Sequence, residues 1–157
     1  MKRCSLLLLS VVLLLFCSCG SSGSGSVRLN RQSFAAGFKA EYRGVEYSGS
    51  VSLKDGITPQ FVISEPEELT GCTVICTDKG VSCTFGSEYS DDVNTVILQR
   101  NPFSDVYSAL NSVSDDAVFK KNSAGFYEYS SDGFSIQTDA RGNIVSLKTQ
   151  ETEFTFT

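Results

Sequence analysis

The chain has 157 residues, of which 18 are acidic and 13 are basic, and it contains neither histidine nor tryptophan. A chain of this length fits one domain. Because histidine is the commonest metal ligand and general base, its absence excludes Ser-His-Asp and Cys-His catalysis.

The first element along the chain is an export signal. Lys2 and Arg3 form a positive start, and residues 6–15 are aliphatic apart from Ser10. This layout is typical of a signal peptide, and its apolar core is shorter than the ~20 residues that a membrane-spanning helix needs. Removal of the signal leaves 11 basic and 18 acidic residues, a net charge of −7. That charge, without a basic run, argues against nucleic acid and against electrostatic docking on anionic lipid.

The end of the signal, Phe-Cys-Ser-Cys over residues 16–19, resembles a bacterial lipobox. The departure from that motif is Phe16, where leucine is usual. The resemblance implies cleavage after Ser18 and diacylation of Cys19 with palmitate-type chains. Since two acyl chains suffice for stable anchoring, we expect a lipoprotein on the extracytoplasmic face of a bacterial cell membrane. The alternative is an ordinary signal peptide whose cysteines are incidental.

The segment after Cys19 is a Gly/Ser run, residues 20–26, and such a composition behaves as flexible coil. Extended to residue 33, it gives an r.m.s. reach of about 20 Å. The sequence therefore predicts a lipoprotein signal peptide over 1–18, lipidated Cys19 with its tether over 19–33, and one β-rich domain over 34–157.

Alternation of apolar and polar residues dominates the domain and predicts antiparallel strands. We expect strands at 34–42, 45–53 and 60–64, a hairpin over 72–85, and strands at 93–98, 117–121, 126–129, 134–138, 144–149 and 153–157. A short helical turn is expected within 64–71. Val145 and Phe154 differ in parity, so a turn or bulge must lie near residues 149–152.

Asn101 and Pro102 begin the one convincing helix, since Asn is a favoured cap and Pro fits the first helical position. One apolar stripe follows, made of Phe103, Val106, Tyr107, Leu110 and Val113. We expect the stripe to pack on the sheet, with partner binding as the alternative. The predicted fold class is mainly β (α+β), a curved antiparallel meander that forms an open half-barrel with one amphipathic helix packed on it.

The order of these elements resembles the LolA/LolB-like group of lipoprotein-localisation and lipid-carrier proteins. The resemblance is carried by the long first hairpin, FVISEPEELTGCTVICTDKGVSCTF over 61–85, the Asn-Pro helix and the terminal TEFTFT. It implies an unclosed β-barrel with an apolar cavity that binds a lipid or acyl chain. The cavity candidates are Phe34, Phe38, Tyr42, Tyr47, Phe61, Tyr107 and Leu110. The alternative is a filled core in a cell-surface protein-interaction module without ligand.

Three cysteines remain in the exported domain, which is an oxidising setting in many bacteria. Cys72 and Cys76 lie about 13 Å apart on one strand, too far for a disulfide. Cys76 faces Cys83 if the turn is a two-residue loop, Lys79-Gly80, whereas a three-residue loop turns Cys83 to the other face. Cys76–Cys83 is therefore a possible disulfide, with free thiols as the alternative.

Carboxylate pairs are the only arrangement that suggests catalysis. Both pairs, Asp91-Asp92 and Asp115-Asp116, lie at loop-like flanks of the helix, where solvated turns are common. Three cysteines at spacings of four and seven without histidine match no zinc pattern. We therefore predict no enzyme, no cofactor and no metal site. The expected partners are the bilayer, through Cys19, and an apolar ligand.

Overall fold

The computed structural model describes residues 25–31, 35–54, 58–86, 88–89 and 101–157. Cys19 with its lipobox, Phe34 and the strand predicted at 93–98 lie outside these ranges. The helices are the 3-10 helix η1 (Glu67–Leu69) and the α-helix α3 (Pro102–Ser112). The strands are β1 (Ser26–Val27), β2 (Ala35–Tyr42), β3 (Val45–Lys54), β4 (Thr58–Glu65), β5 (Cys72–Thr77), β6 (Gly80–Phe85), β7 (Glu88–Tyr89), β8 (Phe119–Lys121), β9 (Tyr127–Ser131), β10 (Phe134–Thr138), β11 (Ile144–Thr149) and β12 (Thr152–Phe156).

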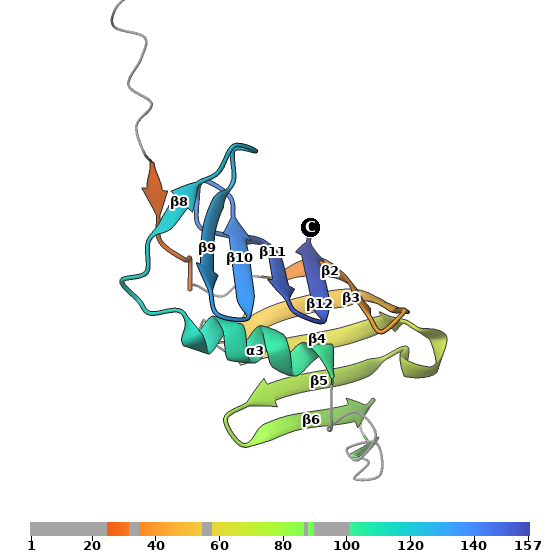
Figure 1. The fold of residues 1–157 in the computed structure, drawn as a ribbon. Coiled ribbons are helices and arrows are strands. Elements are labelled where there is room, and N and C mark those ends of the chain that lie inside the picture. Colours follow the sequence, from red (N-terminus) through yellow and green to blue (C-terminus); the bar gives the residue numbers. More distant parts are fainter. Residues whose placement is uncertain (1–24, 32–34, 55–57, 87, 90–100) are drawn as a thin grey trace, which may run out of the picture.

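All strands that the structure describes belong to one antiparallel sheet, in the order β1-β8-β9-β10-β11-β12-β2-β3-β4-β5-β6-β7. The sheet consists of two meanders, β2–β7 and β8–β12, which join where β12 pairs with β2, and of β1, which pairs with β8. The outer strands β1 and β7 do not pair with each other, so the sheet is not closed (Figure 1). A mainly β fold with a single α-helix is thus confirmed for the described part of the chain.

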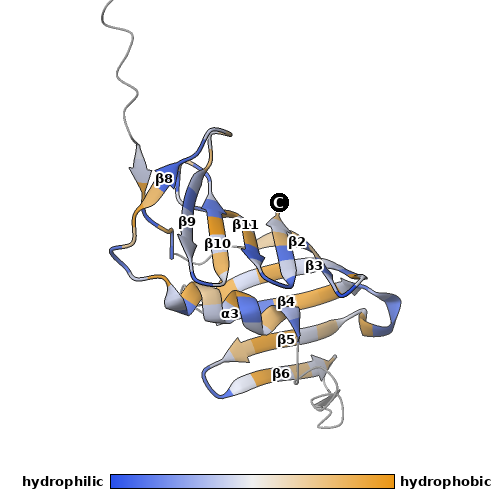
Figure 2. Cartoon of the chain, viewed as in Figure 1, coloured by the Kyte–Doolittle hydropathy of each residue, from blue (hydrophilic) through white to orange (hydrophobic). Residues whose placement is uncertain are grey.

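The interior lies between the sheet and α3. Along β5, Cys72, Val74 and Cys76 are buried while the residues between them are not, as period-2 alternation predicts. Figure 2 shows the same alternation of hydrophobic and hydrophilic residues along β4 and β5. The α3 side chain of Phe103 lies against Phe61 of β4, with ring centroids 4.8 Å apart. Helix and sheet therefore pack together through large apolar side chains.

The disulfide prediction was wrong, because Cys83 bonds to Cys72 and Cys76 is a buried free thiol. The hairpin turn consists of two residues, 78 and 79, since Thr77 pairs with Gly80. This register places Val74, rather than Cys76, opposite Cys83. Cys72 is then a diagonal neighbour of Cys83 on the same face, and their Cα atoms are 6.6 Å apart. That separation lies within the range of about 4.4–6.8 Å that a disulfide bridges.

The segment 25–31, which the sequence assigned to the tether, is docked on the domain. Ser26 and Val27 pair with β8, and the Asn30 backbone N–H donates to the Gly142 carbonyl at 2.9 Å. The Arg31 guanidinium forms an ion pair with Asp115 at 3.0 Å. Composition had suggested a longer coil because the Gly/Ser run continues to residue 26, directly into the paired strand.

Candidate functional site

A pocket of about 690 Å³ lies along one side of α3. Its other walls are the end of β2, the turn between β9 and β10, and the turn between β11 and β12, all gathered at one end of the sheet (Figure 1). The lining residues are Tyr42, Asn101, Ser104, Asp105, Ser108, Ala109, Ser112, Asp132, Gly133, Phe134, Thr149, Gln150 and Glu151. The pocket is therefore polar, and its three carboxylates come from three separate segments.

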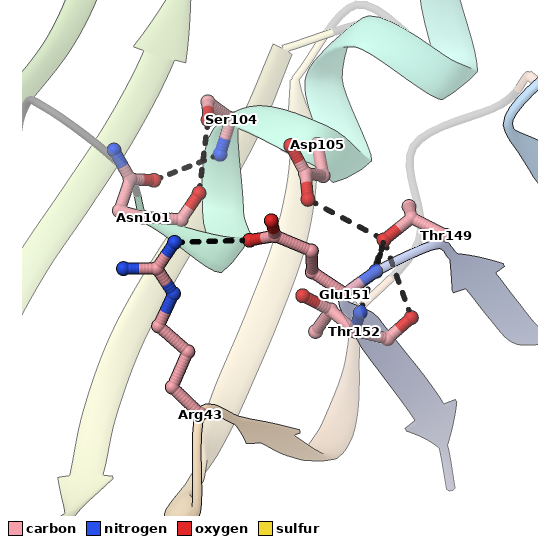
Figure 3. Close-up of polar contacts among 7 residues, drawn as sticks. All are labelled: Arg43, Asn101, Ser104, Asp105, Thr149, Glu151 and Thr152. Carbon is pink, nitrogen blue, oxygen red and sulfur yellow. Dashed lines mark hydrogen bonds and ion pairs between the residues drawn. The ribbon is translucent and has the colours of Figure 1, made fainter.

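The start of α3 forms one wall of the pocket. The Asn101 side-chain oxygen accepts from the backbone N–H of Ser104 at 2.8 Å, as the predicted cap requires (Figure 3). The Ser104 hydroxyl donates back to the Asn101 carbonyl at 2.9 Å. Asn101 is only 5% exposed, yet its amide nitrogen has no hydrogen-bond partner among the described residues. Because buried donors are usually hydrogen-bonded, this amide is available to a ligand in the pocket.

Thr149, at the end of β11, connects the helix to the β11–β12 turn. Its hydroxyl oxygen accepts from the backbone N–H groups of Glu151 at 3.3 Å and Thr152 at 3.1 Å. Its single proton reaches either the Asp105 carboxylate or the Thr152 carbonyl, each at 3.4 Å (Figure 3). The Thr149 side chain thus holds the turn and the α3 carboxylate in one cluster.

Asp105 is a half-buried carboxylate on the pocket side of α3. Burial raises its pKa, the charge of Glu151 raises it further, and the hydrogen bond from Thr149 only partly offsets these effects. No arginine or lysine pairs with Asp105 in the described part of the chain, whereas Asp115, Glu151 and Glu153 each have a basic partner. A partly desolvated carboxylate without a counter-ion is poised to accept one.

Tyr42 and Glu151 form another wall of the pocket, and Arg43 lies beside them. Arg43 lies 3.4 Å from Glu151 and its guanidinium stands over the Tyr42 ring, 5.1 Å from the centroid. Burial raises the pKa of the Tyr42 hydroxyl, Arg43 opposes the shift, and neighbouring Glu151 adds to it. Arg43 has φ of 54°, a value that few non-glycine residues adopt. The backbone therefore places this cation at the tip of the β2–β3 turn despite an unfavoured conformation.

Chemically, the pocket suits a cation. Its carboxylates, Asp105, Asp132 and Glu151, outnumber the single guanidinium at its rim, and its serine and threonine hydroxyls add neutral acceptors. An ammonium or guanidinium group would therefore find charge-assisted hydrogen bonds here. No three histidine, cysteine, aspartate or glutamate side chains among the described residues are arranged to hold a metal ion.

The predicted cavity residues lie in two different places. Phe38, Phe61 and Leu110 are at most 2% exposed and belong to the core cluster, where Leu110 lies on α3 and the two phenylalanine rings pack on each other and on Phe103. Tyr47 and Tyr107 are partly buried against that cluster, and Tyr47 also borders a polar pocket of about 360 Å³ beside β3. Of the named candidates within the described ranges, Tyr42 alone lines the pocket beside α3.

The predicted carboxylate pairs do not meet in the pocket. Asp91-Asp92 lies outside the described residues. Asp115 pairs with Arg31, and Asp116 accepts a hydrogen bond from the Ser114 hydroxyl. Both side chains are exposed, so they occupy a solvated turn of the kind that the sequence suggested as the alternative.

Sequence reasoning missed Asp105, Thr149 and Glu151. The available signal was the polar face of the helix, where Ser104, Asp105 and Ser108 alternate with the apolar stripe. That signal identifies one wall only, because the Asp105–Thr149 contact joins residues 44 positions apart.

No protein-family model matches the chain, and no curated protein is significantly similar to it. Within the described ranges, no helix has the length and apolar character that crossing a membrane requires.

Proposed function

We propose that this protein is a lipid-anchored, extracytoplasmic lipoprotein of a bacterial cell envelope, and that its domain is a protein-interaction module. The partner presents a cationic group, such as a lysine or arginine side chain, to the pocket beside α3. The observation that carries this proposal is Asp105, a partly buried carboxylate that lacks a basic partner among the described residues. The unpartnered amide of Asn101 in the same wall supports it.

The packing of the interior also favours an interaction module. Phe103 of α3 contacts the rings of Phe38, Tyr47, Phe61 and Phe154, with centroids 4.8–6.2 Å apart. These are ordinary distances for aromatic pairs in a packed core. An acyl chain bound at this place would have to displace the helix side chain that now fills it.

The curved shape belongs to the same proposal. An unclosed antiparallel sheet with α3 packed against β4 and β5 supports an open half-barrel of the LolA/LolB-like kind, with an amphipathic helix on its inner face. The burial of Phe103, Val106 and Leu110, beside exposed Ser108 and Asn111, supports the amphipathic character of the helix.

The ligand class is tested by titrating the protein with Nα-acetyl-lysine methylamide and with its neutral norleucine analogue, followed by calorimetry or amide NMR shifts. We expect the lysine probe to bind and shift Ser104 and Thr149 resonances, and Asp105→Asn to weaken it about tenfold or more because a charged hydrogen bond is lost. Asp116→Asn is the matched control, since Asp116 is exposed and outside the pocket. Equal binding of the two probes, or none, overturns the proposed ligand.

Binding of an apolar ligand is a second candidate, favoured by the aromatic rings under α3. Native mass spectrometry of the protein released from detergent micelles distinguishes the two. A lipid that stays bound after the micelle is stripped supports the apolar ligand, whereas bare protein supports the filled interior.

The anchor is tested separately by metabolic labelling with a palmitate analogue. We expect label on the wild type and on Cys17→Ala, and none on Cys19→Ala. An unlabelled wild type contradicts lipidation without bearing on the pocket.

A further inference from the structure

We propose that the edge of the sheet formed by β1 and β8 faces the bilayer, and that a very short tether holds it there. The bilayer-facing surface consists of Val118, Lys120, Lys121 and Phe126 around β8. Its occupant is an anionic phospholipid surface. This inference rests on the lipid anchor proposed above and adds the orientation of the domain.

The first argument is the length of chain between anchor and domain. Because residues 25–31 are docked through β1, Asn30 and Arg31, only residues 20–24 separate Cys19 from the folded part. Five residues span at most about 18 Å even when fully extended. A diacylated Cys19 therefore keeps the β1–β8 edge close to the headgroups.

The second argument is the exposure of apolar side chains at this edge. Val118, directly before β8, is 48% exposed, and Phe126, directly before β9, is 38% exposed. The Asn122 N–H donates to the Phe126 carbonyl at 2.8 Å, so the β8–β9 turn presents Phe126. In Figure 1 this turn lies at the same end of the molecule as β1, the orange-red strand that pairs with β8. By the β8–β9 register, Val118 and Phe126 lie at the two ends of this strand pair, so both apolar side chains are available to a surface that lies along the edge.

The third argument is charge. Lys120 and Lys121 are exposed on β8, and Arg28 is exposed just after β1. Arg141 joins them, because the Arg28 carbonyl lies beside Gly142. Asp115, which is paired with Arg31, and exposed Asp116 directly precede this edge, and two further acids lie on it. Glu128 is opposite Lys120 and accepts hydrogen bonds from Asn122, Ser130 and Gln137, and Asp139 accepts them from Arg141 and Asn143. The sequence hid this basic edge because its four cations come from three separate segments, and anionic lipid attracts such a group.

The orientation places the candidate site away from the membrane. Strands β9–β12 run from the β8 end to the turns that wall the pocket (Figure 1). An anchored domain would thus present Asp105 and Glu151 to partners outside the membrane plane.

The absence of tryptophan from the chain allows a single reporter. Phe126→Trp marks the proposed membrane edge, and Val45→Trp, at a site 41% exposed beside the β2–β3 turn, is the matched control. Each full-length lipoprotein is reconstituted into vesicles of phosphatidylcholine and phosphatidylglycerol, with or without brominated acyl chains. We expect bromine to lower the Phe126→Trp emission at least twofold and to leave Val45→Trp unchanged.

Vesicle flotation separates the two ways of failing. If both variants float with the vesicles but are quenched alike, the orientation is overturned and the anchor stands. If the wild type does not float, the anchor fails and the orientation falls with it.

Two further variants test the stated causes in the Phe126→Trp background. Lys120→Glu with Lys121→Glu should reduce quenching on anionic vesicles but not on phosphatidylcholine alone. A ten-residue Gly/Ser insertion between residues 24 and 25 should also reduce it, because the r.m.s. reach of the tether rises from about 12 Å to about 21 Å. Undiminished quenching in either variant overturns the corresponding cause.

Discussion

The two sides of α3 contrast sharply although both belong to one 11-residue helix and its cap, Asn101. On the inner side, Phe103, Val106 and Leu110 are buried against the sheet and pack in the apolar core. On the pocket side, Asp105 has no basic partner and the Asn101 amide has no hydrogen-bond partner within the described ranges. The apolar side chains on the inner side are packed and stabilise the fold. The polar groups on the pocket side still lack partners and can bind a ligand.

The largest expected effect falls on the inner side. Phe103→Ala should lower the free energy of unfolding by about 3–5 kcal/mol, since it leaves a cavity among four aromatic rings. Ser108→Ala, on the exposed side of the same helix, should change it by no more than about 0.5 kcal/mol. Urea denaturation measures both, and equal midpoints would remove the contrast between the two sides.

The second-largest effect on the free energy of unfolding is expected from the disulfide in the core. Replacing Cys72 and Cys83 together by alanine should cost about 3 kcal/mol, because the cross-link closes a loop with a sequence separation of 11. Cys76→Ala should cost less, about 1 kcal/mol, because it removes only a buried side chain. Denaturation gives the energies. Non-reducing peptide mapping, with fragmentation between Cys72 and Cys76, should identify the 72–83 bond, and a 76–83 bond would contradict the register.

The cap of α3 tests the pocket side. Asn101→Ala removes the acceptor for the Ser104 N–H and should cost about 1 kcal/mol. Asn101→Ser keeps a capping oxygen and deletes the unpartnered amide, so its unfolding free energy should lie closer to that of the wild type. Thermal or urea unfolding ranks the two, and a larger loss in the serine variant would mean that the amide is already satisfied.

The smallest expected effects on stability come from Asp105 and Asp139, whose pKa shifts have opposite signs. The pKa of Asp105 is raised, chiefly by burial, so its contribution to stability is lost as pH rises through that raised pKa. Burial also acts to raise the pKa of Asp139, but hydrogen bonds from Asn143 and Arg141 outweigh it, and the pKa is lowered. That contribution is present above the usual value of 3.8 and lost as pH falls through the lowered pKa.

At pH 7, Asp105→Asn should therefore stabilise the protein and Asp139→Asn should destabilise it, each by less than about 1 kcal/mol. Urea titrations between pH 3 and 7 provide the measurement. The same sign for both variants would remove the distinction between the pocket carboxylate and the turn carboxylate.

Local patterns identified most of the described elements, but not β1, which was assigned to the tether, or β7. Alternation identified β2, β3 and the strands from β8 onward, Asn101-Pro102 marked the start of α3, and the parity change near 149–152 marked the turn before β12. Register was beyond such patterns. Asp78, Lys79 and Gly80 allow several turns, and the structure uses the one in which Gly80 is already the first residue of β6.

The candidate site was less accessible to sequence reasoning because its walls meet only after folding. Tyr42 and Thr152 become neighbours through the β12–β2 pairing, which joins residues farther apart in the sequence than any other described strand pair. The apolar stripe of the helix directed attention to the inner side, where aromatic residues pack, and away from Asp105. Hydrophobic periodicity reports what is buried and is silent about which polar groups converge on the other side.

The β10–β11 turn, which contacts the N-terminal segment, restricts which amino acids can occupy position 142. Gly142 has φ of 83°, and a Cβ there would lie 2.2 Å from the Arg28 carbonyl oxygen. Gly125 has a similar φ of 92° but nothing within 4 Å of a Cβ, so asparagine or aspartate can replace it at modest cost. In a saturation-mutagenesis library, only glycine at position 142 should give a functional protein. If other residues are functional there, the N-terminal segment is not docked on the domain in the living cell.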